Sequence, residues 1–161
     1  MNETFENLTI IQKLKLDDET KVELFNLWNE ECPEKLSHKN IDEFEDHFLK
    51  RENSKHFIVT NQETKIVGWA YCFDRDNEKW FAIILSDKIH GKGVGRKLLD
   101  KLKQTENTLN GWVIDHNNDK KNNGQTYISP IAFYKKCDFE ILENTRIENE
   151  KLKAVKIKWT A

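Results

Sequence analysis

Apolar positions along the chain change their period once in the first half. From Asp17 to Pro33 they recur at spacings of three and four residues, as an amphipathic helix requires, and a similar stretch begins near Asn40. From His56 onward the pattern becomes strand-like, and it predicts strands at 56–60, 66–73 and 80–85 joined by polar turns at 61–64 and 74–78. The run 80–85 is apolar on both faces, which is typical of a central strand covered by helices on both sides.

The second half alternates helices and strands. Val94, Leu98, Leu99 and Leu102 fall on one face of a predicted helix, and Ser129-Pro130 is a typical helix start. Strands are expected at 111–115, 139–142 and 154–159, with an exposed and mobile polar loop at 116–125. With a short strand around Ile10 and Ile11, the order is β-α-α-β-β-β-α-β-α-β-β. It predicts a single α/β domain over 1–161, with one mixed sheet and helices on both faces.

Composition narrows the functional classes. The 161 residues fit one domain, and 26 Lys and Arg against 28 Asp and Glu give a net charge of -2, which argues against a nucleic-acid or membrane-surface binder. The first residues lack a signal-peptide pattern and no apolar run could cross a bilayer, so we expect a cytoplasmic protein. Cys32, Cys72 and Cys137 lie too far apart for a zinc motif or a disulfide framework, so no metal is expected.

A glycine cluster holds the candidate chemistry. Gly91, Gly93 and Gly95, three of the six glycines, lie between strand 80–85 and the helix that follows. The first N–H groups of a helix have no intrahelical partner, the helix dipole is positive there, and glycines let an anion approach the backbone. The neighbouring cations are Lys92, Arg96 and Lys97. The segment therefore predicts an anion site, although it matches neither the P-loop pattern nor the dinucleotide fingerprint.

Two motifs in order resemble one family. The stretch His90-Gly91-Lys92-Gly93-Val94-Gly95, after a buried strand, resembles the acyl-CoA loop of the GNAT family of N-acetyltransferases. Downstream, Phe133-Tyr134-Lys135-Lys136-Cys137-Asp138-Phe139 is similar to that family's aromatic-Tyr-x-Lys-x-Gly-Phe segment. The element order also matches the family over nearly the whole chain. Three positions depart from it: His90 replaces Arg or Gln, Asp138 replaces a glycine that needs a left-handed backbone, and Tyr127 stands where Asn is frequent.

The resemblance implies a fold and a cofactor. The fold would be GNAT-like, with a mostly antiparallel sheet splayed at the cofactor site, and the acyl donor would be acetyl-CoA. Its pyrophosphate would rest on the loop amides and its pantetheine arm along the central strand, where an N–H near Ile84 or Leu85 would polarise the thioester carbonyl. The cofactor-binding residues expected on this basis are Ile83, Ile84, Leu85, His90, Gly91, Lys92, Gly93, Val94, Gly95, Arg96 and Phe133.

The same resemblance implies the chemistry, which is direct attack of a primary amine on the thioester in a ternary complex. Tyr134 is the expected acid for the leaving thiolate, and His116, Asp115 or water would take the proton of the amine. The acceptor would lie between the N-terminal helices and the mouth of the split sheet. Candidate walls, each equally suited to core packing, are Trp28, His38, Trp69, Tyr71, Trp112 and Tyr127.

Two other functions stay open. One is a non-catalytic module of the same fold that binds or senses acyl-CoA, which the departures at His90 and Asp138 favour and Tyr134 disfavours. The other is a modifier of protein or RNA, which the balanced charge disfavours. The expected partner is a small amine or a peptide, with no nucleic acid and no membrane, and the resemblance is compatible with a homodimer.

Overall fold

The computed structural model describes residues 2–5 and 7–161 and forms one mixed sheet. The strands described are β1 (Asn2–Phe5), β2 (Leu8–Lys13), β3 (Glu52–Thr60), β4 (Ile66–Arg75), β5 (Glu78–Leu85), β6 (Thr108–Val113), β7 (Glu140–Glu148) and β8 (Lys153–Thr160). The helices are α1 (Asp18–Glu31), α2 (Ile41–Phe44), α3 (Val94–Thr105) and α4 (Ile131–Lys136). Three short turns of helix add η1 (Glu34–Leu36), η2 (Glu45–Leu49) and η3 (Asp87–Ile89).

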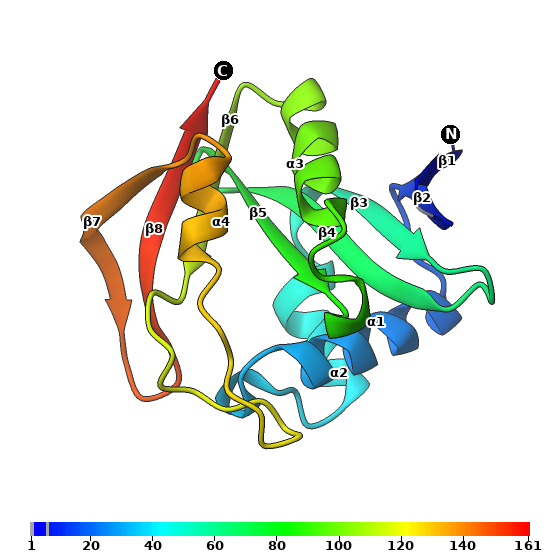
Figure 1. Ribbon diagram of the computed structural model, residues 1–161, viewed down its shortest axis with the longest axis horizontal. Helices are drawn as coiled ribbons and strands as arrows, with labels where there is room; N and C mark the ends of the chain where they lie inside the picture. Colours follow the sequence, from blue (N-terminus) through cyan, green and yellow to red (C-terminus); the bar gives the residue numbers. More distant parts are fainter. Residues whose placement is uncertain (1, 6) are drawn as a thin grey trace.

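The strands lie in the order β1-β2-β3-β4-β5-β6-β8-β7, and only β5 and β6 run parallel. Helices α1 and α2 cover one face and α3 and α4 cover the other (Figure 1). Two hydrophobic cores result. Leu98, Leu99 and Leu102 of α3 belong to one, and Leu24 and Leu27 of α1 to the other. The prediction of an α/β mixed sheet with helices on both faces is confirmed.

The sheet divides between β5 and β6. These two strands share one register pair, Trp80 with Asn110, whereas β6 pairs with β8 from Thr108 to Val113. Beyond Trp80, residues 81–85 of β5 have no partner on β6. Figure 1 shows the two strands diverging from this point, with α4 beside the opening. The splay that the resemblance implied is therefore present in the backbone.

Several boundaries differ from the predictions. The turn expected at 74–78 consists of Asp76 and Asn77 alone, whose φ values of 51° and 61° suit a tight hairpin with right-handed strand twist. The N-terminal strand is a hairpin of β1 and β2, and the stretch from Asn40 is one α-helical turn continued by the π-helical segment η2. Helix α4 begins at Ile131, one residue later than Ser129-Pro130 predicts, and β7 continues to Glu148.

The predicted polar loop 116–125 is present and mostly exposed, with two buried residues as exceptions. Its sequence is wholly polar, yet Asp119 and Lys121 are buried. Pro33 pairs with Lys121 in an isolated β-bridge, and the Glu34 N–H donates to the Lys120 carbonyl at 2.8 Å. The segment is therefore docked on the end of α1, because tertiary hydrogen bonds satisfy polar groups that the sequence pattern assigned to solvent.

The remaining expectations concern single residues. Asp138 adopts φ 68°, which confirms the left-handed backbone expected there. Cys72 and Cys137 are buried, Cys32 is half-buried, and all three are free thiols. None of the described helices is both long and apolar enough to cross a membrane.

Candidate active site

The N-terminus of α3 has no cap of its own. Gly93 is the N-cap residue with φ 80°, it provides no side-chain hydrogen bond, and the first turn contains no acidic residue. The first intrahelical bond of this turn is from the Lys97 N–H to the Gly93 carbonyl, at 3.1 Å. The amides of Val94, Gly95 and Arg96 therefore have no intrahelical acceptor, which leaves them for an anion.

The three glycines of the loop have two different roles. Gly91 and Gly93 have φ values of 76° and 80°, a left-handed backbone that other residues adopt at a cost. A Cβ at Gly91 would meet nothing within 4 Å. A Cβ at Gly95 would lie 3.1 Å from Phe133 Cζ, so Gly95 allows α3 to approach α4 closely. Gly91 and Gly93 thus shape the anion loop, whereas Gly95 serves helix packing.

Two polar side chains tie this loop to its surroundings. The Nε2 atom of His90 lies 3.1 Å from the Leu85 carbonyl oxygen and must donate to it, since a carbonyl can only accept. The Arg96 guanidinium donates to the Lys136 carbonyl at 3.2 Å, at the C-terminal end of α4. Arg96 therefore combines positive charge near the loop with a link between α3 and α4.

The open edge of β5 can be assigned residue by residue. Ser86 donates its N–H to the Val67 carbonyl at 2.8 Å, so it is a hydrogen-bonded partner in the β4–β5 ladder. Because the bonding direction alternates along an antiparallel strand, Ile84 also faces β4, whereas Ile83 and Leu85 face the side where β6 has diverged. The sequence placed the polarising amide at Ile84 or Leu85, and this alternation favours Ile83 and Leu85.

Tyr134 lies on α4 beside the split. Its ring packs against Phe81, Phe133 and Phe139, with ring centres 5.8, 5.1 and 5.4 Å away. Only 6% of the residue is exposed, none of the described residues hydrogen-bonds its hydroxyl, and burial raises the pKa of the phenol. The hydroxyl therefore holds its proton until a stronger base, such as a leaving thiolate in the same site, takes it.

The two candidate bases are both engaged. The Asn118 N–H donates to His116 Nδ1 at 3.1 Å, so the ring proton resides on Nε2, which is buried without a partner. The Asp115 carboxylate accepts two hydrogen bonds from Arg146, at 2.7 and 3.0 Å, and these hold its pKa below the usual range. His116 must release its hydrogen bond before Nδ1 can accept a proton, and the two bonds from Arg146 make Asp115 a weaker base.

The candidate acceptor walls divide into buried and accessible residues. Trp69 and Tyr71 are 0% and 2% exposed and pack in the core under α2, so they present no free surface. Trp28 and Trp112 are half-buried on the same face of the sheet, packed against Phe48 and Trp80 with ring centres 4.4 and 5.5 Å apart. His38 is buried beside Trp28, with ring centres 5.6 Å apart.

Tyr127 connects this face with the cofactor side. Burial raises the pKa of its phenol, with smaller contributions from nearby Cys32, Tyr134 and Asp119. Its N–H donates to the Asp119 carbonyl at 2.9 Å, within the docked 116–125 segment. Tyr127 therefore lies close to both Tyr134 and the end of α1.

One ion pair that joins these parts has no signal in any local sequence pattern. The Glu31 carboxylate accepts from Lys121 Nζ at 2.9 Å and from the Asp87 N–H at 3.3 Å. The side chains of Glu31 and Lys121 are 10% and 11% exposed. Glu31 thus holds the 116–125 segment and the turn after β5 against the end of α1, and the 90-residue separation of the pair explains why no local pattern revealed it.

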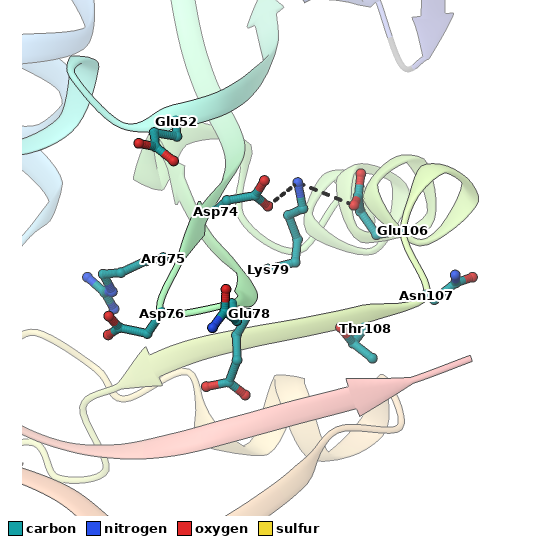
Figure 2. A pocket seen from close by; sticks show the side chains of 10 residues that line it. Glu52, Asp74, Arg75, Asp76, Glu78, Lys79, Glu106, Asn107 and Thr108 are labelled. Carbon is teal, nitrogen blue, oxygen red and sulfur yellow. Dashed lines mark ion pairs between the residues drawn. The ribbon is translucent and has the colours of Figure 1, made fainter.

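Two hollows lie elsewhere on the molecule. One of about 570 Å³ and one of about 470 Å³ adjoin the β4–β5 turn, at the opposite end of β5 from the glycine loop. Figure 2 shows the first, where Lys79 bridges Asp74 and Glu106 at 2.7 and 3.5 Å. Neither hollow is lined by Tyr134.

Comparison with known proteins gives the family. The model of the acetyltransferase (GNAT) domain matches residues 53–141, more than half of the chain. The chain therefore belongs to the GNAT family of acetyltransferases, and its acyl donor is acetyl-CoA. Comparison with curated proteins finds no match.

Solved structures agree on the fold. An aminoglycoside 6'-N-acetyltransferase complexed with coenzyme A has a TM-score of 0.71 and 13% identity, over 94% of this chain and 96% of that chain. A GNAT acetyltransferase from Staphylococcus aureus Mu50 has a TM-score of 0.67 and 16% identity, over 95% of this chain and 98% of that chain. A spermidine N-acetyltransferase from Vibrio cholerae, in complex with CoA and spermine, has a TM-score of 0.66 and 16% identity, over 97% of this chain and 96% of that chain. At these identities the likeness concerns the fold.

Proposed function

We propose that this protein transfers an acetyl group from acetyl-CoA to a primary amine by direct attack in a ternary complex. The observation that carries the proposal is the convergence of three features at one split in the sheet. They are the uncapped N-terminus of α3, the unpaired edge of β5, and the buried phenol of Tyr134. Each supplies one requirement of the reaction: anion binding, thioester placement and proton donation.

The acyl donor would extend from the glycine loop along β5. The pyrophosphate would accept from the loop amides after Gly91, and the pantetheine arm would pair with the backbone groups of Ile83 and with the N–H of Leu85, whose carbonyl already accepts from His90. The free Ile83 N–H would donate to the thioester oxygen as negative charge grows on it. Related structures complexed with coenzyme A support this placement through the shared fold.

The proton transfers follow from the same geometry. A neutral amine attacks the thioester carbonyl carbon, the C–N bond forms, and the tetrahedral intermediate then breaks its C–S bond. Tyr134 gives its proton to the departing sulfur, and the ammonium proton passes to water, because His116 and Asp115 are engaged in other contacts. The tyrosinate takes a proton back from water, which restores the phenol for the next turnover. His116 would act as the base only after its hydrogen bond to Asn118 is released.

Replacing Tyr134 with Phe tests the mechanism. We expect kcat to fall by about 10²–10⁴, the usual range for loss of a general acid, with acetyl-CoA affinity unchanged by calorimetry. Tyr71→Phe is the matched control, because it removes a hydroxyl from a buried tyrosine of the other core that presents no free surface to a substrate. An unchanged kcat at saturating acetyl-CoA in Tyr134→Phe would show that the acid assignment is wrong.

An assay of CoA release by the wild-type protein distinguishes this proposal from the non-catalytic alternative. CoA release is measured with amines of different classes, including spermidine, an aminoglycoside, amino acids and a peptide with a free N-terminus. The enzyme releases CoA in proportion to at least one acceptor. Tight acetyl-CoA binding without release for any of them would favour the binding or sensing module.

A further inference from the structure

Two arginines share the aromatic layer on the α1/α2 face. Arg51 precedes β3, and its Cζ lies 4.5 Å from the centre of the Phe73 ring. Arg75 ends β4, with its Cζ 5.5 Å from the Phe73 centre and 4.4 Å from the Trp80 centre. Trp80 in turn stacks on Trp112, one of the accessible candidate walls. The guanidinium groups therefore belong to the same layer as the expected acceptor site.

Neither arginine has a carboxylate partner among the described residues. Arg51 Nε is buried and makes no hydrogen bond, and Figure 2 shows Arg75 directed away from the ion pairs that join Asp74, Lys79 and Glu106. Burial and the nearby Arg51 lower the pKa of Arg75. The two guanidinium groups repel each other, and the exposed Asp76 carboxylate near Arg75 offsets this repulsion only in part because water screens its charge. A bound anion would offset the rest.

The other charges around the pair are accounted for. Both arginines line the hollow of about 470 Å³, together with Asp46, His47, Lys50, Glu52, Asp74 and Asp76. Asp46 pairs with Lys50 at 2.6 Å, and Asp74 pairs with Lys79 and accepts from Asn53. Glu52 and Asp76 are exposed, where water screens their charge, although Asp76 acts on the Arg75 guanidinium. The hollow therefore keeps unused guanidinium donors beside solvated carboxylates.

The arginines lie within reach of the reacting carbonyl. Trp80, Ala82 and Ile84 share one face of β5, and successive residues on one face are about 7 Å apart. The Arg75 guanidinium, stacked on Trp80, is thus roughly 10 Å along the strand from the thioester position proposed near Ile83. An extended acceptor with its amine at the thioester would bring its far end to the two guanidiniums.

We propose that Arg51 and Arg75 bind a carboxylate at the far end of the acceptor, so that the substrate class is a primary amine that carries a carboxylate. This assignment rests on the proposed acetyltransferase function. The planar guanidinium fork matches a carboxylate geometrically, and charge-assisted pairs of this kind are stronger than neutral hydrogen bonds. A polyamine would instead bring further positive charge to an unpaired cationic pair.

A matched set of acceptors tests the assignment: 6-aminohexanoate, 6-aminohexanamide and 1,6-diaminohexane. They share one chain length and differ in the charge of the far end. In the wild-type protein we expect kcat/KM for 6-aminohexanoate to exceed that for the amide by about tenfold or more, and the diamine to be the poorest. In Arg51→Gln/Arg75→Gln this ratio falls to about one, with kcat/KM for the amide unchanged.

Lys65→Gln is the control, because it removes the positive charge of an exposed residue that does not line this hollow. It keeps the wild-type preference. A preference for the diamine, or a carboxylate preference that survives in the double variant, would overturn the assignment. Two single variants, Arg51→Lys and Arg75→Lys, serve if the double variant unfolds. Each keeps the positive charge but loses the planar guanidinium group, and each lowers the preference for 6-aminohexanoate over the amide.

A binding experiment separates this inference from the proposed function. The product 6-acetamidohexanoate is titrated calorimetrically into the wild-type protein and the double variant, both saturated with CoA. Binding to the wild type alone supports the arginine site even where no amine is acetylated, an outcome that would refute only the catalytic proposal. Equal binding to both proteins, or binding to neither, refutes the arginine site whatever the turnover.

Discussion

Helices α1 and α3 begin in opposite ways. The Asp17 carboxylate accepts the Thr20 N–H at 2.8 Å, and Asp18 and Glu19 place negative charge in the first turn of α1. Helix α3 begins at Gly93, with no side-chain cap and no acidic residue in its first turn. The chain satisfies the N-terminus of α1 with its own side chains, whereas no side chain caps that of α3, where we propose that the pyrophosphate binds.

The difference is possible because α3 is held by its side. Leu98, Leu99 and Leu102 are at most 1% exposed, so burial of this face stabilises the helix whatever happens at its end. Gly95 adds a close contact with Phe133 of α4. A binding helix can thus omit the usual cap when packing, rather than capping, fixes its position.

The largest effect should come from placing a carboxylate at the start of α3. Gly93→Asp supplies a carboxylate where the pyrophosphate would accept, and we expect acetyl-CoA affinity to fall by about 100-fold through repulsion and lost donors. The backbone can accept it, since Asp138 already adopts φ 68° in this chain. Gly93→Asn has nearly the same side-chain shape without the charge. Calorimetry should show that its loss of acetyl-CoA affinity is about ten times smaller than that of Gly93→Asp. Equal affinity for wild type and Gly93→Asp would refute anion binding at α3.

A smaller effect is expected from Gly91→Ala. Gly91 and Gly124 have φ values of 76° and 86°, and a Cβ would meet nothing within 4 Å at either. Both alanine variants should therefore lose about 1–2 kcal/mol of stability through the left-handed backbone alone. Only Gly91→Ala should also raise the KM for acetyl-CoA, by about tenfold, because its loop carries the amides. A similar KM in both variants would contradict this.

The smallest effect lies at α1. Asp17→Ala should lower the melting temperature by a few degrees and leave acetyl-CoA affinity unchanged, while Asp18→Ala, which removes the same charge without a cap, should change little. Hydrogen bonds from Thr20 hold the pKa of Asp17 below its ordinary value of 3.8. Its stabilisation is therefore complete above pH 3.8 and disappears as the pH falls through the lowered pKa. A changed acetyl-CoA affinity in Asp17→Ala would contradict the contrast between a structural N-terminus at α1 and a cofactor-binding N-terminus at α3.

Local patterns predicted the elements well where burial follows one period. The helix from Val94 and the apolar strand 80–85 appear in the structure with nearly the expected bounds, because their side chains pack as their spacing indicates. The hairpin at Asp76 and Asn77 was placed within a longer turn, since strand continuation through Arg75 depends on pairing with Glu78. The exposed loop at 116–125 is present, but the burial of Asp119 and Lys121 within it comes from contacts with η1 and α1, which are remote in sequence.

Local sequence patterns also predict only part of the candidate site. The loop at Gly91 and Gly93 could be found because a helix N-terminus after a buried strand is a local feature. The unpaired Arg51 and Arg75, and the pair of Glu31 with Lys121, could not, since each depends on side chains brought together from separate elements. Among the expected walls, only the structure distinguishes buried Trp69 and Tyr71 from accessible Trp28 and Trp112.

The sequence by itself determined the class of fold, the family resemblance and the uncapped, glycine-shaped start of α3, because each is written in residues within a few positions of one another. Tertiary structure alone decided which side of β5 is open, which aromatic residues reach the surface and which charges lack partners. The physical reason is that strand pairing, burial and electrostatic neutralisation depend on distances in space. The fold brings residues that are far apart in the chain close together in space, as in the pairs Trp80 and Asn110, Glu31 and Lys121, and Arg75 and Arg51.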